Sequence, residues 1–171
     1  IKTLFEETSD KYVEPQHPLL FFPNSNTDFI WQSQRTGYNH LFHYSLEKGL
    51  VAQITKGDWL VTDILGFNEK KKEIYYTSTQ ESPLERHLYR INWNNFKTQK
   101  LSAAPGMHTG ILSKDGTQLY DIYSNATTPR SVNLLNTSTL KSKNILTSEN
   151  PLKNYKRPKI KNVTLKADDG T

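Results

Sequence analysis

Short apolar stretches separated by polar turns recur along this chain at nearly constant intervals. Phe22, Phe67 and Leu112 stand 45 residues apart, and a polar turn follows each of them. The end of the next apolar stretch recurs in the same way, at Ser33, Ser78 and Ser124. Helical periodicity is weak throughout, whereas the stretches have the length and the flanking turns of strands. The pattern therefore predicts a repeated unit made of strands.

Each repeat contains four predicted strands. The first is apolar and nearly continuous, which is typical of a strand covered on both faces. The second is aromatic, as in Ile-Tyr-Tyr at 74–76, and the third alternates, as in His-Leu-Tyr-Arg-Ile at 87–91. The predicted strands are 19–22, 28–33, 40–46 and 51–55 in the first repeat, 60–67, 73–79, 87–93 and 99–102 in the second, and 109–113, 118–123, 131–136 and 142–146 in the third.

A repeat of this length with four short strands is typical of a β-propeller blade. We therefore predict an all-β fold, a partial β-propeller of about three four-stranded antiparallel blades at 12–56, 57–103 and 104–147. Residues 1–11 are predicted to be the last strand of a preceding blade, and residues 148–171 a linker and the first strand of a following domain. Three blades cannot close a ring, so we expect the chain to be part of a larger protein.

Composition narrows the possible functions. Hydrophobic residues are 35% of the chain and aromatic residues 11%, which suits half-exposed strands and not a disordered chain. No apolar run approaches the ~18 residues of a membrane-spanning helix. The absence of cysteine excludes disulfides, thiolate metal sites and a cysteine nucleophile. The net charge is +5, but the basic residues are scattered and not interleaved with aromatics, so we expect no nucleic-acid partner.

Two histidines lie three residues apart in a predicted strand, at His40 and His43. Residues three apart on a strand point to opposite faces, so the two rings cannot converge on one metal ion. His40 also recurs as His87 one repeat later, which indicates a structural position. We predict no metal site and no cofactor.

Four motifs resemble one known family. The sequences Gly-Tyr-Asn-His-Leu-Phe at 37–42 and Ile-Thr-Lys-Gly-Asp-Trp-Leu-Val at 54–61 are similar to the propeller of the dipeptidyl peptidase IV family, which are prolyl oligopeptidase-type serine peptidases. Tyr-Val-Glu-Pro at 12–15 resembles a blade start in bacterial members. Lys-Ala-Asp-Asp-Gly-Thr at 166–171 resembles the entry into that family's α/β-hydrolase domain.

The resemblance implies that these are the last three blades of an eight-bladed ring that gates and positions peptide substrates. The whole protein would be a serine exopeptidase that removes N-terminal dipeptides, with Pro or Ala preferred second. The family's Ser, Asp and His would follow Thr171, and no Gly-x-Ser-x-Gly motif occurs, so this segment alone should be inactive. By the same resemblance we expect a periplasmic or cell-envelope location. The resemblance is also compatible with a homodimeric whole protein.

Four residues are predicted to face the substrate cleft. The resemblance places Val13 and Glu14 where the propeller meets the hydrolase active site. Trp59 begins an inner strand, where it could line a cleft or pack in the core. His108 stands at a blade start, and such blade ends ring the central channel of a propeller; a solvated or turn histidine is the alternative.

Glu6-Glu7 invites comparison with the glutamate pair with which the family holds the substrate ammonium. The family pair sits in an earlier blade, whereas Glu6-Glu7 ends an outer strand, so we do not assign it that role.

The competing function is a non-catalytic interaction propeller that scaffolds proteins or binds a ligand. A WD-repeat scaffold would carry Trp-Asp at each blade end, and that dipeptide is absent. Three excised blades would expose two blade faces, so we expect the isolated chain to self-associate.

Overall fold

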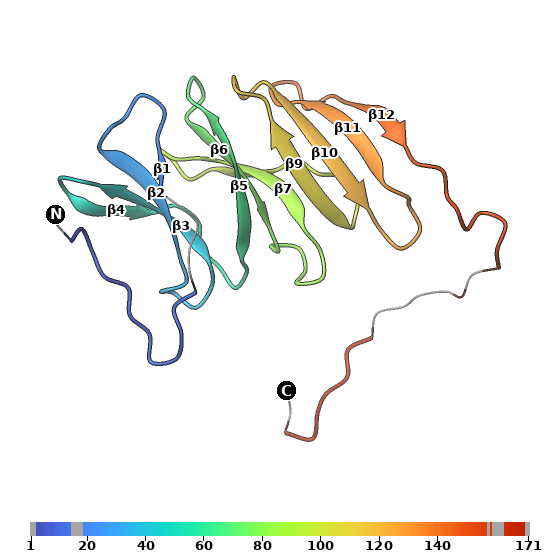
Figure 1. The fold of residues 1–171 in the computed structure, drawn as a ribbon, viewed down its shortest axis with the longest axis horizontal. Coiled ribbons are helices and arrows are strands. Elements are labelled where there is room, and N and C mark those ends of the chain that lie inside the picture. The colour runs from blue at the N-terminus through green and yellow to red at the C-terminus, as the bar shows by residue number, and fades with distance from the viewer. Residues whose placement is uncertain (1–2, 15–18, 157, 159–162, 170–171) are drawn as a thin grey trace.

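The computed structural model describes residues 3–14, 19–156, 158 and 163–169 (Figure 1). This part of the chain contains no helix, and its strands form three four-stranded sheets. The first sheet contains β1 (Leu20–Phe21), β2 (Asp28–Ser33), β3 (His40–Ser45) and β4 (Gly49–Gln53). The second contains β5 (Val61–Asn68), β6 (Glu73–Ser78), β7 (His87–Asn92) and β8 (Thr98–Lys100). The third contains β9 (Met107–Leu112), β10 (Gln118–Ser124), β11 (Ser131–Asn136) and β12 (Ser142–Thr147).

Every sheet is an antiparallel meander in which each strand pairs with its neighbours in the sequence. The sheets follow one another in chain order across Figure 1, from the blue first sheet to the orange third. This arrangement of consecutive meanders is that of adjacent propeller blades. The prediction of an all-β partial β-propeller is confirmed.

The first two sheets are joined by an apolar core. Phe22, Ile30 and Leu41 of the first repeat pack with Ile74 and Tyr76 of β6. The core between the second and third sheets is built in the same way, from Tyr75, Leu88, Leu119 and Leu135. Because successive side chains on a strand point to opposite faces, β6 supplies one core with Tyr76 and the other with Tyr75. This double burial explains the aromatic, almost wholly buried second strand.

Polar contacts and close approaches of the backbone also join the second and third sheets. Arg90 donates from Nη1 to the Thr137 carbonyl at 2.7 Å. Asn68 donates from Nδ2 to the Gly116 carbonyl at 3.1 Å. Gly110 lets β9 approach the second sheet, because a Cβ there would lie 2.4 Å from Cδ1 of Leu65. The two sheets are therefore fixed in register by directional contacts as well as by the core.

The two outermost sheet faces differ in their cover. On the first sheet, Phe5 of the N-terminal segment packs against Trp31 and Tyr44, with ring centroids 5.3 and 4.5 Å apart. On the third sheet, Ile111 and Tyr120 stand opposite each other on β9 and β10 and are both exposed. An apolar strip is thus left uncovered by the described residues at one end of the row of sheets.

Two predicted segments lie outside the sheets. Residues 3–11 form no strand, and their role as the last strand of a preceding blade stays a prediction. The strand predicted within 148–171 is not seen in the described residues: residues 148–156, 158 and 163–169 form no strand, and the remaining positions lie outside the described part. The blade boundaries and the following domain therefore also stay predictions. In the described residues, no helix has the length and apolarity needed to cross a membrane.

Candidate functional site

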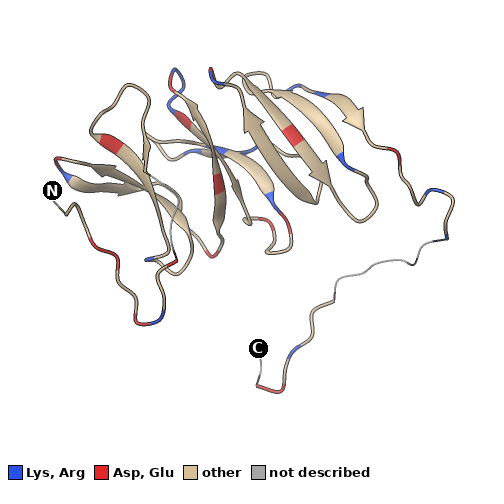
Figure 2. Cartoon of the chain, in the orientation of Figure 1, with Lys and Arg blue, Asp and Glu red and all other residues tan. Residues whose placement is uncertain are grey.

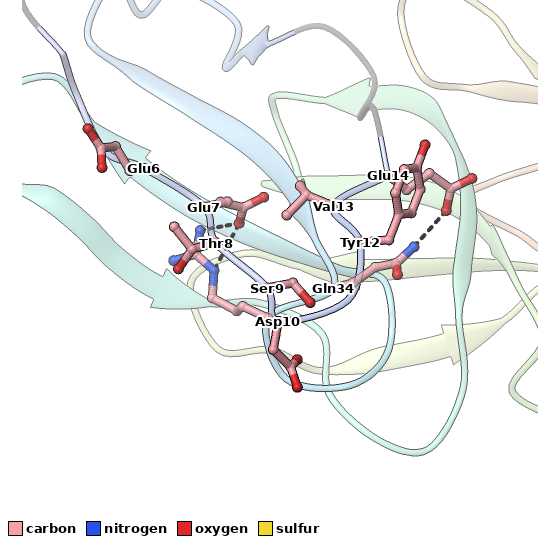
Figure 3. Close-up of a pocket in the computed structure, with 10 residues that line it drawn as sticks. Glu6, Glu7, Thr8, Ser9, Asp10, Tyr12, Val13, Glu14 and Gln34 are labelled. Atoms are coloured by element: carbon pink, nitrogen blue, oxygen red, sulfur yellow. Dashed lines mark hydrogen bonds and ion pairs between the residues drawn. The ribbon is translucent and has the colours of Figure 1, made fainter.

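A pocket of about 790 Å³ lies where the N-terminal segment meets the turn between β2 and β3 (Figure 3). One wall is formed by the segment itself, and the other by two turn residues, Gln34 and Arg35. The segment is acidic, as the red positions near the N-terminus in Figure 2 show. The residues of the segment that line the pocket are Glu6, Glu7, Thr8, Ser9, Asp10, Tyr12, Val13 and Glu14.

Arg35 binds one end of this segment. Its Nη2 lies 2.5 Å from Oε1 of Glu7, and the hydroxyl of Ser33 donates to the same oxygen. The guanidinium also lies over the Phe42 ring, 4.9 Å from its centroid, and donates from Nη1 to the Tyr44 hydroxyl at 2.5 Å. A guanidinium held on an aromatic face and bonded to a carboxylate is a strong, directional contact.

These contacts keep Glu7 ionised. Burial alone would raise the pKa of Glu7, but hydrogen bonds from Ser33 and Arg35 outweigh it, so its pKa lies below the ordinary value of 4.5. The side chains of Arg35 and Glu7 are only 31% and 14% exposed, so solvent screens the pair less than a fully exposed one. The ion pair is therefore present throughout the neutral and mildly acidic range.

Gln34 binds the other end of the segment. Its Nε2 donates to Oε2 of Glu14 at 2.8 Å, a bond drawn as a dashed line in Figure 3. Val13 lies beside Glu14 on the same wall and also lines a second pocket of about 420 Å³ with Leu4 and Trp31. Two of the four predicted residues, Val13 and Glu14, thus come together at one pocket.

Trp59 lies elsewhere. It is half-buried against the core between the first two sheets, with its ring 4.9 Å from that of His40 and 6.3 Å from that of Tyr76. Gly57 makes this possible, since a Cβ at that position would lie 2.3 Å from Nε1 of Trp59. Trp59 therefore has a packing role, and its contact with a substrate stays a prediction.

His108 is buried between the second and third sheets. Its Nδ1 lies 2.6 Å from Oδ1 of Asp121, and its Nε2 lies 2.8 Å from the Ala104 carbonyl oxygen. The ring also stacks on Tyr123 at 5.0 Å. Both ring nitrogens of His108 thus have hydrogen-bond partners inside the fold. The role facing the substrate cleft that the sequence predicts for His108 stays a prediction.

The remaining histidines of the strands also have internal partners. His40 is buried between Thr55 and the Gly57 carbonyl, whereas His43 bonds from Nε2 to Oδ1 of Asp28 at 2.8 Å. Burial lowers the pKa of His40 below its ordinary 6.5. Within the part of the chain that the structure describes, no three His, Asp or Glu side chains are placed to hold a metal ion.

The fold and the comparisons with known proteins indicate the same class of protein. Consecutive four-stranded meanders with a pocket at one end of the row define a propeller segment, and the family model of the dipeptidyl peptidase IV (DPP IV) N-terminal region matches residues 1–130. The chain belongs to the dipeptidyl peptidase IV family and lies in its N-terminal region. The resemblance seen in the sequence motifs is confirmed.

Solved structures support this assignment. A Bacteroides ovatus protein, described as a candidate dipeptidyl aminopeptidase IV, is 40% identical with a TM-score of 0.83 over 95% of this chain and 26% of its own. Porphyromonas gingivalis dipeptidyl peptidase 4 is 26% identical with a TM-score of 0.69 over 75% of this chain and 18% of its own. The chain therefore spans about a quarter or less of these proteins.

Sequence relatives show the same partial coverage. Dipeptidyl peptidase 4 of Trichophyton rubrum is 28% identical over 162 residues, which are 86% of this chain and 20% of that protein. A protein named probable dipeptidyl peptidase 4 in Aspergillus flavus is 34% identical over 93 residues, or 54% of this chain and 12% of its own length. The chain thus spans a fifth or less of the length of these two relatives.

Proposed function

We propose that this chain is a substrate-gating and positioning segment of the propeller in a serine exopeptidase that removes N-terminal dipeptides, with Pro or Ala preferred second. The observation that supports this most directly is the match of 95% of the chain, at 40% identity, to the Bacteroides ovatus structure. The catalytic Ser, Asp and His are supplied by the rest of the protein, so the segment alone is inactive.

In this reaction the segment holds and positions the peptide substrate. A propeller beside a hydrolase domain encloses a cavity that admits peptides and excludes folded proteins. Contacts from its ends hold the peptide, and holding a reactant in place lowers the entropy cost of reaching the transition state. Val13 and Glu14, at the wall of the 790 Å³ pocket, are the residues we propose to lie within reach of the peptide. Acyl transfer at a serine needs no metal or cofactor.

The partners follow from the same proposal. Further blades cover the exposed outer face of the third sheet, and the hydrolase domain follows the chain. We also propose a periplasmic or cell-envelope location and a homodimeric whole protein. Cell fractionation and sedimentation of the full-length protein test these two points separately.

The decisive experiment uses the full-length protein that contains this chain. Gly-Pro and Ala-Ala anilides are offered with a free and with an acetylated amino terminus, and release of the chromophore is followed. We expect cleavage of the free-amine substrates only, abolished when the serine nucleophile is alkylated. Equal cleavage of the acetylated substrates would indicate an oligopeptidase, and no cleavage of either would favour a non-catalytic interaction propeller.

A further inference from the structure

The turn between β2 and β3 fastens the N-terminal segment at two points. Arg35 holds Glu7 and Gln34 holds Glu14, and the residues between these two glutamates form one wall of the pocket (Figure 3). We call Glu7, Glu14, Gln34 and Arg35 the clasp. Both ends of the wall are thus tied to neighbouring residues of a single tight turn.

The repeat shows which part of the clasp the fold itself requires. Gln34 follows the recurring Ser33, and the residues at the same place in the next two repeats are Thr79 and Asn125. Thr79 accepts a hydrogen bond from the backbone N–H of Leu60 at 2.9 Å. In the third repeat, Asn125 donates from Nδ2 to the carbonyl of Pro105 at 2.9 Å. In these two sheets the segment before the inner strand is fastened through its backbone.

In the first sheet, by contrast, the described part of the preceding segment is fastened through its side chains. Gln34 binds the carboxylate of Glu14, and the position after it is Arg35, where the second and third repeats carry uncharged Gln80 and Ala126. A charged pair is thus added at the one sheet whose preceding segment lines the 790 Å³ pocket. The two repeats that lack the clasp form complete sheets, so the clasp exceeds what the fold needs.

We propose that Gln34 and Arg35 are positioning residues for the peptide substrate: Gln34 fixes the Glu14 carboxylate at the pocket wall, and Arg35 anchors the other end of that wall through Glu7. This inference rests on the proposed function, in which the pocket faces the path of the peptide. Neither residue was singled out from the sequence, because each acts through a glutamate far away along the chain.

The test measures kcat and KM of the full-length peptidase on a free-amine peptide. Gln34→Met removes the donor to Glu14 with little change in side-chain length. We expect KM to rise about threefold with kcat unchanged, because the lost hydrogen bond is exposed and positions Glu14 at the pocket wall, away from the reacting centre. Gln34→Lys, which can still donate to Glu14, should keep KM close to that of the wild type.

A double variant tests whether Gln34 acts through Glu14. If it does, Gln34→Met combined with Glu14→Ala should raise KM no further than Glu14→Ala alone, since coupled residues are not additive. A further rise in the double variant would overturn the proposed role of Gln34.

The control is Arg90→Met. Arg90 forms an ion pair with Glu73 at 3.3 Å, with side chains 15% and 14% exposed, on the sheets away from the pocket. Arg35→Met should raise KM, whereas Arg90→Met should lower Tm and leave KM unchanged. If both arginine variants lower Tm and neither changes KM, the clasp is only structural and the inference is wrong while the proposed function stands. If the wild-type protein cleaves no free-amine substrate, both are wrong.

Discussion

Ser102 Oγ lies 2.8 Å from Nδ1 of His87 and also accepts a hydrogen bond from the backbone N–H of Leu88. One sheet earlier, Thr55 makes the same two contacts with His40 and Leu41. Because the hydroxyl accepts from the backbone, its proton is available to the imidazole. In these two sheets the hydroxyl thus ties the residues just after the last strand to the third strand, and the recurring histidine is a structural element.

Removing this hydroxyl should destabilise the second sheet. Ser102→Ala leaves the Leu88 N–H and Nδ1 of His87 without their partner in a buried site, which should cost roughly 1–3 kcal/mol of unfolding free energy. Ser102→Thr is the matched control, because the first sheet uses Thr55 at the same place. Urea unfolding of the three proteins makes the comparison, and an alanine variant as stable as the wild type would contradict it.

The burial of His40 should make stability depend on pH. Its pKa is lowered in the folded state, chiefly by burial, whereas the unfolded chain has the ordinary value of 6.5. Below pH 6.5 the unfolded state therefore binds more protons, and stability falls as the pH drops from there through the folded pKa. The midpoint of urea unfolding should decrease between pH 7 and pH 5, and His40→Gln should flatten this decrease. An equal slope in the variant would show that other groups cause it.

One turn carries a removable strain. Phe96, between β7 and β8, has φ 58° and a side chain that is 44% exposed. A left-handed conformation costs an ordinary residue roughly 1 kcal/mol, and glycine avoids that cost. Phe96→Gly should therefore raise Tm, whereas Phe96→Ala, which keeps the Cβ, should not. A lower Tm for the glycine variant would mean that packing of the Phe96 ring outweighs the strain.

The outer face of the third sheet should cause the isolated chain to self-associate. Ile111 and Tyr120 stand opposite each other and are 56% and 42% exposed, and Met107, farther along β9, is also exposed. Uncovered apolar strips of this kind promote association. Analytical ultracentrifugation should show oligomers that become monomers in the double variant Ile111→Asp, Tyr120→Asp. A wild-type chain that stays monomeric over a wide concentration range would contradict the prediction.

The sheets were predictable because their signals are local. The strand predicted at 131–136 coincides with β11, and the one at 28–33 coincides with β2. Alternation and turn residues act between neighbours, so a single sequence contains them. β1 is only two residues long because Phe22, although buried, already belongs to the turn and donates to the Asp28 carbonyl.

The site was less predictable because its contacts join distant positions. Only a family resemblance, and not their own chemistry, points to Val13 and Glu14, and their contact with the peptide stays a prediction. Arg35 binds Glu7, 28 positions away, and no spacing rule links the two. For Trp59 and His108 the sequence leaves the direction of the side chain open, since either face of an inner strand can be apolar. Packing of adjacent sheets decides that direction.

Within each meander, the paired strands are always consecutive in the sequence. A sheet of this kind can form on the ribosome as soon as its own four strands have emerged, before the next sheet has been synthesised. Each finished sheet then presents a face on which its successor can assemble. The row of sheets can therefore be extended by repeating one unit. Side-chain contacts such as those of Gln34 with Glu14 and of Arg35 with Glu7 can be present in one unit alone.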